Sequence, residues 1–296
     1  MVLFAVTGLA TGCLTSYDTT KVSVVEVDSV DQEAEQDLAS SDADATEQEL
    51  AEVEQELEDF QDFEQDTLPD DGRVRDGLLA LYRFDEGQGP VANNQVAELS
   101  TLELRRFGEP ERPLPWRADA WGLHFSETND RVQMLEHEAL ISRLQQSGAL
   151  TIELWLSVDG GTGLRDRCRL FGYEQTTTVR NFAVQLLPDG RPQGRLNGAE
   201  WNADALLPRD QATHLVLTAA NGEARWYLDA TPTGNRQYGG DFGSWASEGY
   251  QVCVGNICQA DQDRHFEGDI LLVAVYERAL SPEDVTQNFE AGPPTP

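Results

Sequence analysis

The chain has 296 residues, and its charge is distributed very unevenly. Residues 14–72 contain 21 Asp and Glu but a single basic residue, Lys21, so most of the formal net charge of −32 lies there. Residues 73–296 carry the remaining −12 and are numerous enough to pack one β-sandwich domain. A chain this acidic repels nucleic-acid phosphates and anionic lipid surfaces, so we expect neither as a partner.

The first twelve residues form a short apolar run that ends at small residues directly before Cys13. This run is too short to cross a bilayer as a helix. Ala10, Thr11 and Gly12 before Cys13 resemble the lipobox of a bacterial lipoprotein, which implies a signal peptide over residues 1–12 and a lipid on Cys13. The run lacks Lys and Arg. An ordinary secretory signal, a truncated buried strand and a start further upstream therefore stay open as alternatives.

Export of the protein would place it outside the cytoplasm, where its cysteines can form disulfides. Leu14 is not the Asp that resembles an inner-membrane retention signal, so we expect the outer membrane or cell surface, with the lipid as the only membrane anchor. Beyond Cys13, the residues Cys168, Cys253 and Cys258 allow one disulfide and leave one thiol. Cys253 and Cys258 could meet across a tight turn, but the sequence does not select the pair. Too few His and Cys lie nearby for a closed zinc site.

Residues 13–72 are predicted to form an acidic, low-complexity tether. The segment has too few apolar residues to offset the entropy of an ordered chain, so we expect most of it to be disordered. Apolar residues recur at helical spacing behind a Thr-x-x-Glu capping box that starts at Thr46, which predicts a short helix within residues 46–63. This helix could dock a partner, but its uniform charge favours a spacer between membrane and domain.

From Gly77 onward, short alternating strands separated by Gly, Asn, Asp and Pro are typical of an all-β sandwich or barrel. In residues 151–158, four branched apolar side chains alternate with Thr, Glu, Trp and Ser. Successive side chains of a strand point to opposite faces, so the apolar set lies on one face of this strand. Trp155 on the polar side predicts that the second face is covered as well.

Two further local patterns predict elements towards the end of the chain. Asn221 and Gly222 favour the positive φ angles of a tight turn, which predicts a hairpin over residues 215–229. The apolar run 270–276 predicts a strand inside the sandwich. Ser as N-cap, Pro at the first helical position and a final Gly predict a short helix within residues 281–292.

Five sequence blocks resemble, in the same order, those of bacterial laminin-G-like domains of the concanavalin-A-like lectin/glucanase superfamily. The blocks are Gly77–Gly89 with its Phe-Asp-Glu-Gly, Gly122–Val132, Leu150–Leu156, His214–Asp229 and Val254–Ser281. The resemblance implies an all-β fold over residues 73–296, a two-sheet antiparallel jelly-roll sandwich followed by the short C-terminal helix.

The resemblance also raises the question of a structural calcium ion. Members of the superfamily often hold calcium near strand ends, and Asp85, Asp130 and Asp269 are conceivable ligands because calcium prefers carboxylate oxygens. Leu271 and Leu272 replace the Asp-Glu of the family pattern. Isolated carboxylates on an acidic surface are usually only solvated, so calcium and plain solvation stay alternatives.

The same fold hosts glycoside hydrolases, so catalysis must be judged from the residues. Those glucanases place two carboxylates on alternate residues of one strand. Glu153 is the only acid on its strand, and Trp155 follows two positions later. The chain also lacks a Gly-x-Ser-x-Gly elbow, and its four His residues do not cluster. We therefore expect no enzymatic activity and keep a glycoside hydrolase as the least favoured alternative.

A recognition function is the favoured prediction. Tyr238, Phe242 and Trp245 lie in an aromatic, Gly-rich loop over residues 236–250, and Trp201 is a second candidate. Such rings can stack on sugar faces. They can equally close one end of the sandwich, which we favour because long loops often pack their own aromatics.

Two functions follow from the sequence. The first is a monomeric surface lipoprotein that recognises a glycan or an extracellular protein without catalysis. The second is a structural or adhesive envelope component without a dedicated ligand site. The sequence names no ligand.

Overall fold

The computed structural model of the chain describes residues 71–118, 120–160, 167–259 and 264–295. All of them belong to one unit, Glu64–Pro296. The predicted signal segment 1–12, Cys13, the helix within 46–63 and the tether up to residue 70 lie outside the described residues. Within the described ranges, no helix combines the length and the apolar character that a membrane crossing requires.

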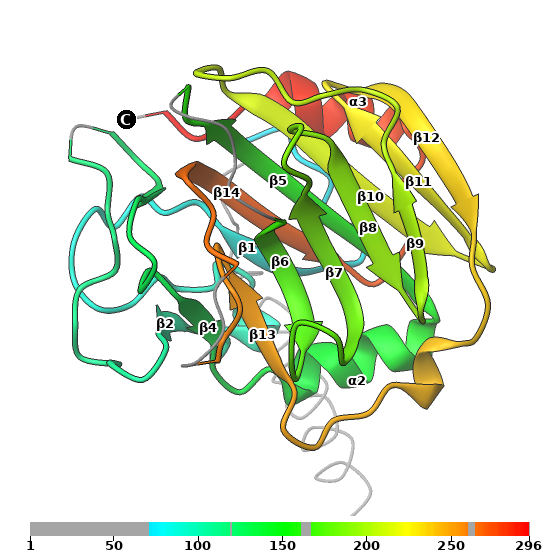
Figure 1. Cartoon of the computed structure of the whole chain (residues 1–296), viewed down its shortest axis with the longest axis horizontal. Coiled ribbons are helices and arrows are strands. Elements are labelled where there is room, and N and C mark those ends of the chain that lie inside the picture. The colour runs from blue at the N-terminus through cyan, green and yellow to red at the C-terminus, as the bar shows by residue number, and fades with distance from the viewer. Residues whose placement is uncertain (1–70, 119, 161–166, 260–263, 296) are drawn as a thin grey trace, which may run out of the picture. The chain divides into compact units, whose positions relative to one another are not determined.

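Two antiparallel sheets of seven strands each pack face to face, which confirms the predicted jelly-roll sandwich (Figure 1). Sheet I consists of β1 (Leu78–Tyr82), β14 (Gly268–Tyr276), β5 (Ala149–Val158), β10 (Thr213–Ala220), β11 (Glu223–Leu228) and β12 (Thr231–Gln237), with β3 (Leu123–Phe125) paired to β14. Sheet II consists of β2 (Leu104–Arg106), β4 (Val132–Met134), β13 (Gln251–Val254), β6 (Cys168–Glu174), β7 (Arg180–Leu186), β8 (Pro192–Leu196) and β9 (Ala199–Asn202).

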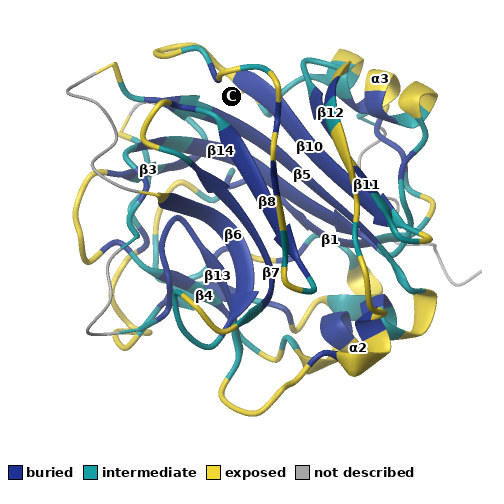
Figure 2. Ribbon diagram, turned by 45° about the vertical axis from the view of Figure 1, so that its right-hand side comes forward, coloured by how far each residue is buried: buried dark blue, intermediate teal, exposed yellow. Residues whose placement is uncertain are grey.

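The main core lies between the two sheets, and strand alternation fills it. Ile152, Leu154, Leu156 and Val158 of β5 all belong to this core, as their spacing predicted. Figure 2 shows the strands of both sheets as largely buried, while the connecting loops are exposed. Because a fully buried large apolar side chain contributes about 1.5–3 kcal/mol, this core is the main source of the domain's stability.

One end of the sandwich is closed by helix α2 (Glu138–Ser147), which the sequence analysis did not predict. Leu140, Ile141 and Leu144 lie on one side of α2 and are buried in the main core. The 3-10 helix η2 (Phe242–Ser244) packs against α2 at the same end. The segment 236–250 therefore contributes to closing the sandwich.

The predicted hairpin and C-terminal helix are both present. Strands β10 and β11 pair in register up to Ala220 and Glu223, and Asn221 and Gly222 between them have φ angles of 52° and 79°. Helix α3 (Pro282–Ala291) begins after Ser281, whose side chain accepts a hydrogen bond from the backbone of Asp284 in a reciprocal capping box.

The outer face of sheet I is covered, as Trp155 predicted. Helix α3 packs on it, and Val285 joins Trp155, Tyr227 and other apolar side chains in a second, smaller core. The rings of Trp155 and Phe289 stack with centroids 5.8 Å apart. The central strands β14, β5 and β10 of sheet I are therefore buried on both faces.

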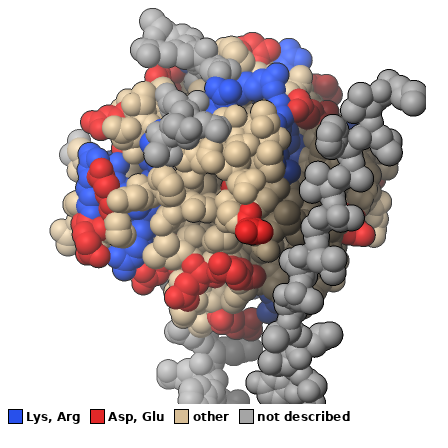
Figure 3. Space-filling view, turned by 60° about the horizontal axis from the view of Figure 1, so that its bottom comes forward, with Lys and Arg blue, Asp and Glu red and all other residues tan. Residues whose placement is uncertain are grey.

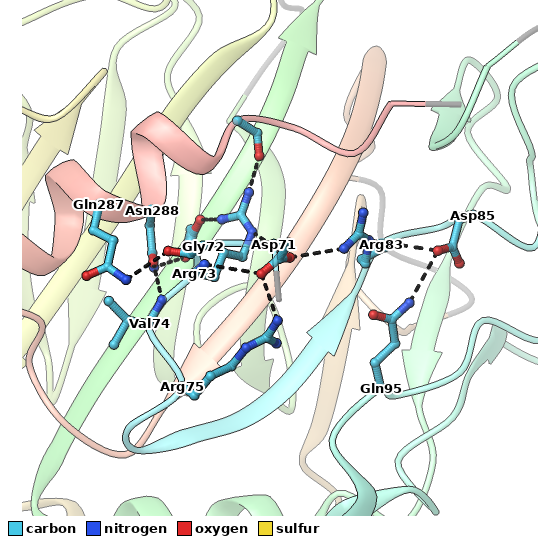
Figure 4. A network of polar contacts seen from close by, with 12 residues as sticks. Asp71, Gly72, Arg73, Val74, Arg75, Arg83, Asp85, Gln95, Gln287 and Asn288 are labelled. Atoms are coloured by element: carbon cyan, nitrogen blue, oxygen red, sulfur yellow. Dashed lines mark hydrogen bonds and ion pairs between the residues drawn. The ribbon is translucent and has the colours of Figure 1, made fainter. Parts of the chain in front are cut away.

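A polar network beneath α3 fastens the start of the domain to this face. The buried carboxylate of Glu153 forms an ion pair with Arg73 and accepts a hydrogen bond of 2.6 Å from Asn288 Nδ2. Its Oε1 also lies 3.1 Å from His214 Nε2. Asn288 Oδ1 in turn accepts from the backbone nitrogen of Val74 at 2.8 Å (Figure 4). Residues from three distant parts of the chain thus meet at one buried carboxylate.

Cys253 and Cys258 form a disulfide, while Cys168 is a buried thiol. This confirms the prediction of one disulfide and one thiol beyond Cys13, and it selects the pair that the sequence left open.

Candidate functional site

The outer face of sheet II differs from that of sheet I because it carries polar side chains. On β7 to β9, residues of the main core such as Phe182, Val184, Leu196 and Trp201 alternate with polar residues that point outward. We call this outward set the polar face; it comprises Arg169, Glu174, Arg180, Gln185, Gln193, Arg195, Glu200 and Asn202.

Strand register places four of these residues in one row across four strands. Arg169 of β6 lies opposite Gln185, Gln185 opposite Gln193, and Gln193 opposite Asn202. Each neighbouring pair is hydrogen-bonded: Arg169 donates to Gln185, Gln185 donates to Gln193, and Gln193 Nε2 donates to Asn202 Oδ1 at 2.8 Å. The row begins at a buried arginine and ends at the exposed amide of Asn202. Such a chain of bonds fixes the orientation of every member.

A second row is formed by small residues and one ion pair. Gly172, Ala183, Arg195 and Glu200 lie opposite one another in turn. A Cβ atom at Gly172 would lie only 3.2 Å from Glu174 Oε1, so the side chain of Glu174 lies close over this backbone. Arg195 Nη1 forms an ion pair with Glu200 Oε1 at the exposed edge of the face.

A third row contains Gln251, Glu174 and Arg180. Gln251 of β13 lies opposite Glu174, and Glu174 lies opposite Arg180. The register of β6 and β7 shifts at this point, so Asn181 is an extra residue, and Arg180 shares the outward direction of Glu174. Glu174 is held by Arg169, whose Nη2 donates to Oε2 at 2.6 Å.

Two buried polar atoms lie next to these rows without a hydrogen-bond partner among the described residues. They are Nε of Arg195, a donor, and Oε1 of Gln251, an acceptor. An unpaired buried donor or acceptor costs about 1–3 kcal/mol, so such atoms normally have a partner. The described residues of the polar face therefore leave one donor and one acceptor unused.

The aromatic residues proposed from sequence lie elsewhere and are mostly buried. Phe242 and Trp245 stack on each other with centroids 4.4 Å apart in the main core, and Trp245 Nε1 donates to Asn197 Oδ1 at 2.6 Å. Trp201 packs in the same core beside Trp226, and Tyr238 is half-buried against it. This is the geometry of the alternative in which the rings close the sandwich. Sugar stacking by these rings stays an untested prediction.

The three aspartates proposed as calcium ligands each pair with an arginine. Asp130 accepts a hydrogen bond from Arg106 Nη1 at 2.7 Å, Asp269 forms an ion pair with Arg117 Nε at 3.1 Å, and Asp85 lies 3.8 Å from Arg83 Nε. In the described ranges, no three His, Cys, Asp or Glu side chains come together in a group that could hold a metal. Carboxylates already neutralised by guanidinium groups are a poor fit to a calcium site.

The buried glutamates do not form a pair of catalytic carboxylates. Glu153 is fully buried and surrounded by Arg73, His214 and Asn288. Both oxygens of Glu174 accept hydrogen bonds from Arg169. Neither carboxylate presents an oxygen to a substrate, whereas a glycosidase needs two carboxyl groups flanking the scissile bond.

Comparison with known families agrees with this fold. The family model described as the concanavalin A-like lectin/glucanases superfamily (Laminin_G_3) matches residues 127–286. The chain belongs to this superfamily. The matched region of the superfamily domain contains the whole polar face. A comparison with curated proteins finds no match.

Solved structures share the fold at low sequence identity. The sialidase of Trypanosoma rangeli in complex with a difluorinated KDN matches 72% of this chain at 11% identity and a TM-score of 0.53. The same sialidase with 2,3-difluorosialic acid has a TM-score of 0.53 and 14% identity. Domain 4 of AbnA, a GH43 extracellular arabinanase from Geobacillus stearothermophilus, in complex with arabinotriose, has a TM-score of 0.49 and 17% identity, covering 72% of this chain and 98% of its own. The chain covers only 32% of the sialidase, so that likeness concerns the fold alone.

The sequence carries only an ambiguous signal of the polar face, which was therefore not among the predicted sites. Between Gln185 and Asn202, polar residues recur at every second position within strands, which is also the pattern of an ordinary solvent-facing strand. Only the register between strands shows that these residues form hydrogen-bonded rows.

Proposed function

We propose that the chain is a non-catalytic recognition protein whose superfamily domain binds a glycan through the polar face. The observation that carries this proposal is the hydrogen-bonded row from the buried Arg169 to the exposed Asn202, which fixes the orientation of the amide group that reaches the surface. Hydroxyl groups of sugars both donate and accept hydrogen bonds, and such pre-oriented groups match them at a low entropy cost. The superfamily name, which joins lectins and glucanases, supports the same ligand class.

Other surface features favour a polar ligand over an apolar one. Among the described residues, the only large hydrophobic side chains that are exposed are Val179 and Leu206. Two isolated side chains do not make an apolar patch of the size that protein partners usually need. A glycan is therefore the favoured ligand, ahead of an extracellular protein.

The test is a glycan array probed with the full chain, followed by titration calorimetry on each glycan that binds. Asn202→Ala removes the exposed end of the row without opening the core. One lost hydrogen bond is worth about 0.5–1.5 kcal/mol, so N202A should weaken binding up to about tenfold. Asn235→Ala, an exposed asparagine on β12 of sheet I, is the matched control and should bind like the parent chain.

Two results would contradict the proposal. An array without any bound glycan would favour the alternative of a structural envelope component. Equal affinities for N202A and the parent chain would place the binding site away from the polar face.

We further propose that the protein is exported and anchored by a lipid on Cys13 at the outer membrane or cell surface. The support is the apolar run before Cys13 together with a disulfide, which forms in oxidising compartments. Cys13→Ser should move the protein from the membrane fraction to the soluble fraction, because the acyl chains would be its only anchor. A variant that stays in the membrane fraction would refute the anchor.

A further inference from the structure

The polar face concentrates positive charge in an otherwise acidic protein. Four arginines lie on or beside it, whereas the only carboxylates that the described residues place on it are those of Glu174 and Glu200; the arginines are Arg167, Arg169, Arg180 and Arg195. Residues 73–296 have a formal charge of −12, so this excess runs against the composition of the domain. Figure 3 shows a face of the molecule whose centre is largely uncharged, with basic and acidic side chains lying next to one another at its edge.

Both carboxylates of the polar face are already used by other arginines. Glu174 is held through both oxygens by Arg169. Glu200 forms its ion pair with Arg195, and its second oxygen lies 3.9 Å from Arg167 Nη1. Ion pairs among the described residues therefore do not neutralise a further guanidinium group on this face.

Among the described residues, Arg180 is the arginine of the polar face that forms no ion pair with a carboxylate. It is half-buried and donates a hydrogen bond to the backbone oxygen of Thr177, and no carboxylate of the described residues forms an ion pair with it. Burial, and next the positive charges of Arg195 and Arg169, lower its pKa to about 10. A charge held against such repulsion costs stability, and sites of this kind are typical of ligand binding.

Arg195 offers a second unsatisfied group on the same face. Its Nη1 pairs with Glu200, but its buried Nε has no hydrogen-bond partner among the described residues. Arg195 is also one of the charges that act on Arg180. A bound anion would offset the repulsion between the two arginines.

We propose that the glycan bound by the polar face carries an anionic group, a carboxylate or a sulfate ester, and that Arg180 and Arg195 hold this group. The inference rests on the glycan-binding function proposed above. Guanidinium groups bind carboxylate and sulfate oxygens through paired, charge-assisted hydrogen bonds. The acidic remainder of the chain repels densely charged polymers, so the ligand is a saccharide with few charges rather than a polyanion.

The test compares matched charged and neutral saccharides by titration calorimetry on the full chain. One pair is trigalacturonate and its fully methyl-esterified form; the other is a sulfated chondroitin disaccharide and its desulfated form. In at least one pair the charged member should bind ten times more tightly or better, and its affinity should fall as salt is raised because charges are screened. Which pair shows the difference distinguishes a carboxylate ligand from a sulfate ligand.

Arg180→Gln tests the role of the unpaired arginine, with Arg225→Gln on β11 as the control. R180Q should weaken binding of the charged saccharide about tenfold or more, and it should weaken binding of the neutral one much less. Its melting temperature should not fall, because removing Arg180 relieves repulsion. R225Q removes an exposed arginine from sheet I and should change none of these values.

Three results would overturn the inference: equal binding of charged and neutral members, an equal loss for both in R180Q, or a clear fall of the R180Q melting temperature. If the members of each pair bind equally and N202A weakens that binding, glycan recognition stands and only the anionic ligand fails. If no saccharide binds at all, both proposals fail.

Discussion

Replacing Arg73 by Met tests how much the fold is destabilised when the buried carboxylate of Glu153 loses its ion-pair partner. The side chains of both residues are almost completely buried, at 2% and 0% exposure. Breaking a buried ion pair by removing one partner costs about 3–5 kcal/mol, because the other charge stays buried without compensation. A domain of this size is stable by only about 5–15 kcal/mol, so R73M should lose a large part of its free energy of unfolding.

The pH dependence of this loss gives an independent check. Burial by itself raises the pKa of Glu153, but the charge of Arg73 and the hydrogen bonds from His214 and Asn288 outweigh it and hold the pKa below 4.5, its ordinary value. In the parent chain, Glu153 therefore stabilises the fold above that value, and this contribution is lost as the pH falls through the lowered pKa. In R73M the effect of burial gains weight and moves the pKa upward. The difference in stability between R73M and the parent should then be larger at pH 7 than at pH 4.

The assay is urea denaturation followed by tryptophan fluorescence at both pH values. Arg75→Met is the matched control, because Arg75 forms an ion pair with Asp71 at 2.7 Å but its side chain is 33% exposed. Partly exposed pairs are worth about 0–1 kcal/mol, so R75M should stay within that range. A loss below about 1 kcal/mol for R73M at pH 7, or a loss that does not change with pH, would refute this account of Glu153.

Three further outcomes are expected. Trp245→Ala should lower the free energy of unfolding by about 3–5 kcal/mol in the same urea assay, because it opens a cavity in the main core; a near-neutral effect would favour the ring as a binding platform. Thiol titration of Cys13→Ser, denatured without reductant, should detect one thiol, that of Cys168, and three would contradict the disulfide. Gly222→Ala should cost about 1–2 kcal/mol, because its φ angle of 79° disfavours a Cβ atom; an unchanged midpoint of denaturation would count against this turn geometry.

Elements with a clear local sequence signal, such as apolar alternation, a turn pair or capping residues, could be predicted from sequence alone. Strand β5 was recognisable because its apolar residues alternate, and the hairpin between β10 and β11 because Asn221 and Gly222 favour positive φ angles. Helix α3 was recognisable from its capping residues. Helix α2 was missed because it is only ten residues long and buries three side chains, too few for a clear helical repeat among strand patterns.

The candidate site was harder to predict, for a physical reason. The loop aromatics were chosen because rings can stack on sugars, but the same rings bury large apolar areas, and in Trp245 and Phe242 burial prevails. The residues of the polar face lie far apart in sequence, as Arg169 and Asn202 illustrate. Their proximity follows from strand register, which depends on pairing between strands and not on any local pattern.

Hydrogen bonds of Arg73 and Gln287 bring the two ends of the domain to the same corner. Arg73 donates a hydrogen bond to the backbone oxygen of Gly292, and Gln287 Nε2 donates to the backbone oxygen of Gly72 at 2.8 Å. A domain whose ends meet can be inserted into a loop of another protein, or repeated in tandem, with linkers of only a few residues. This corner lies on the outer side of sheet I. The domain can therefore be inserted into a host protein while the outer face of sheet II stays accessible.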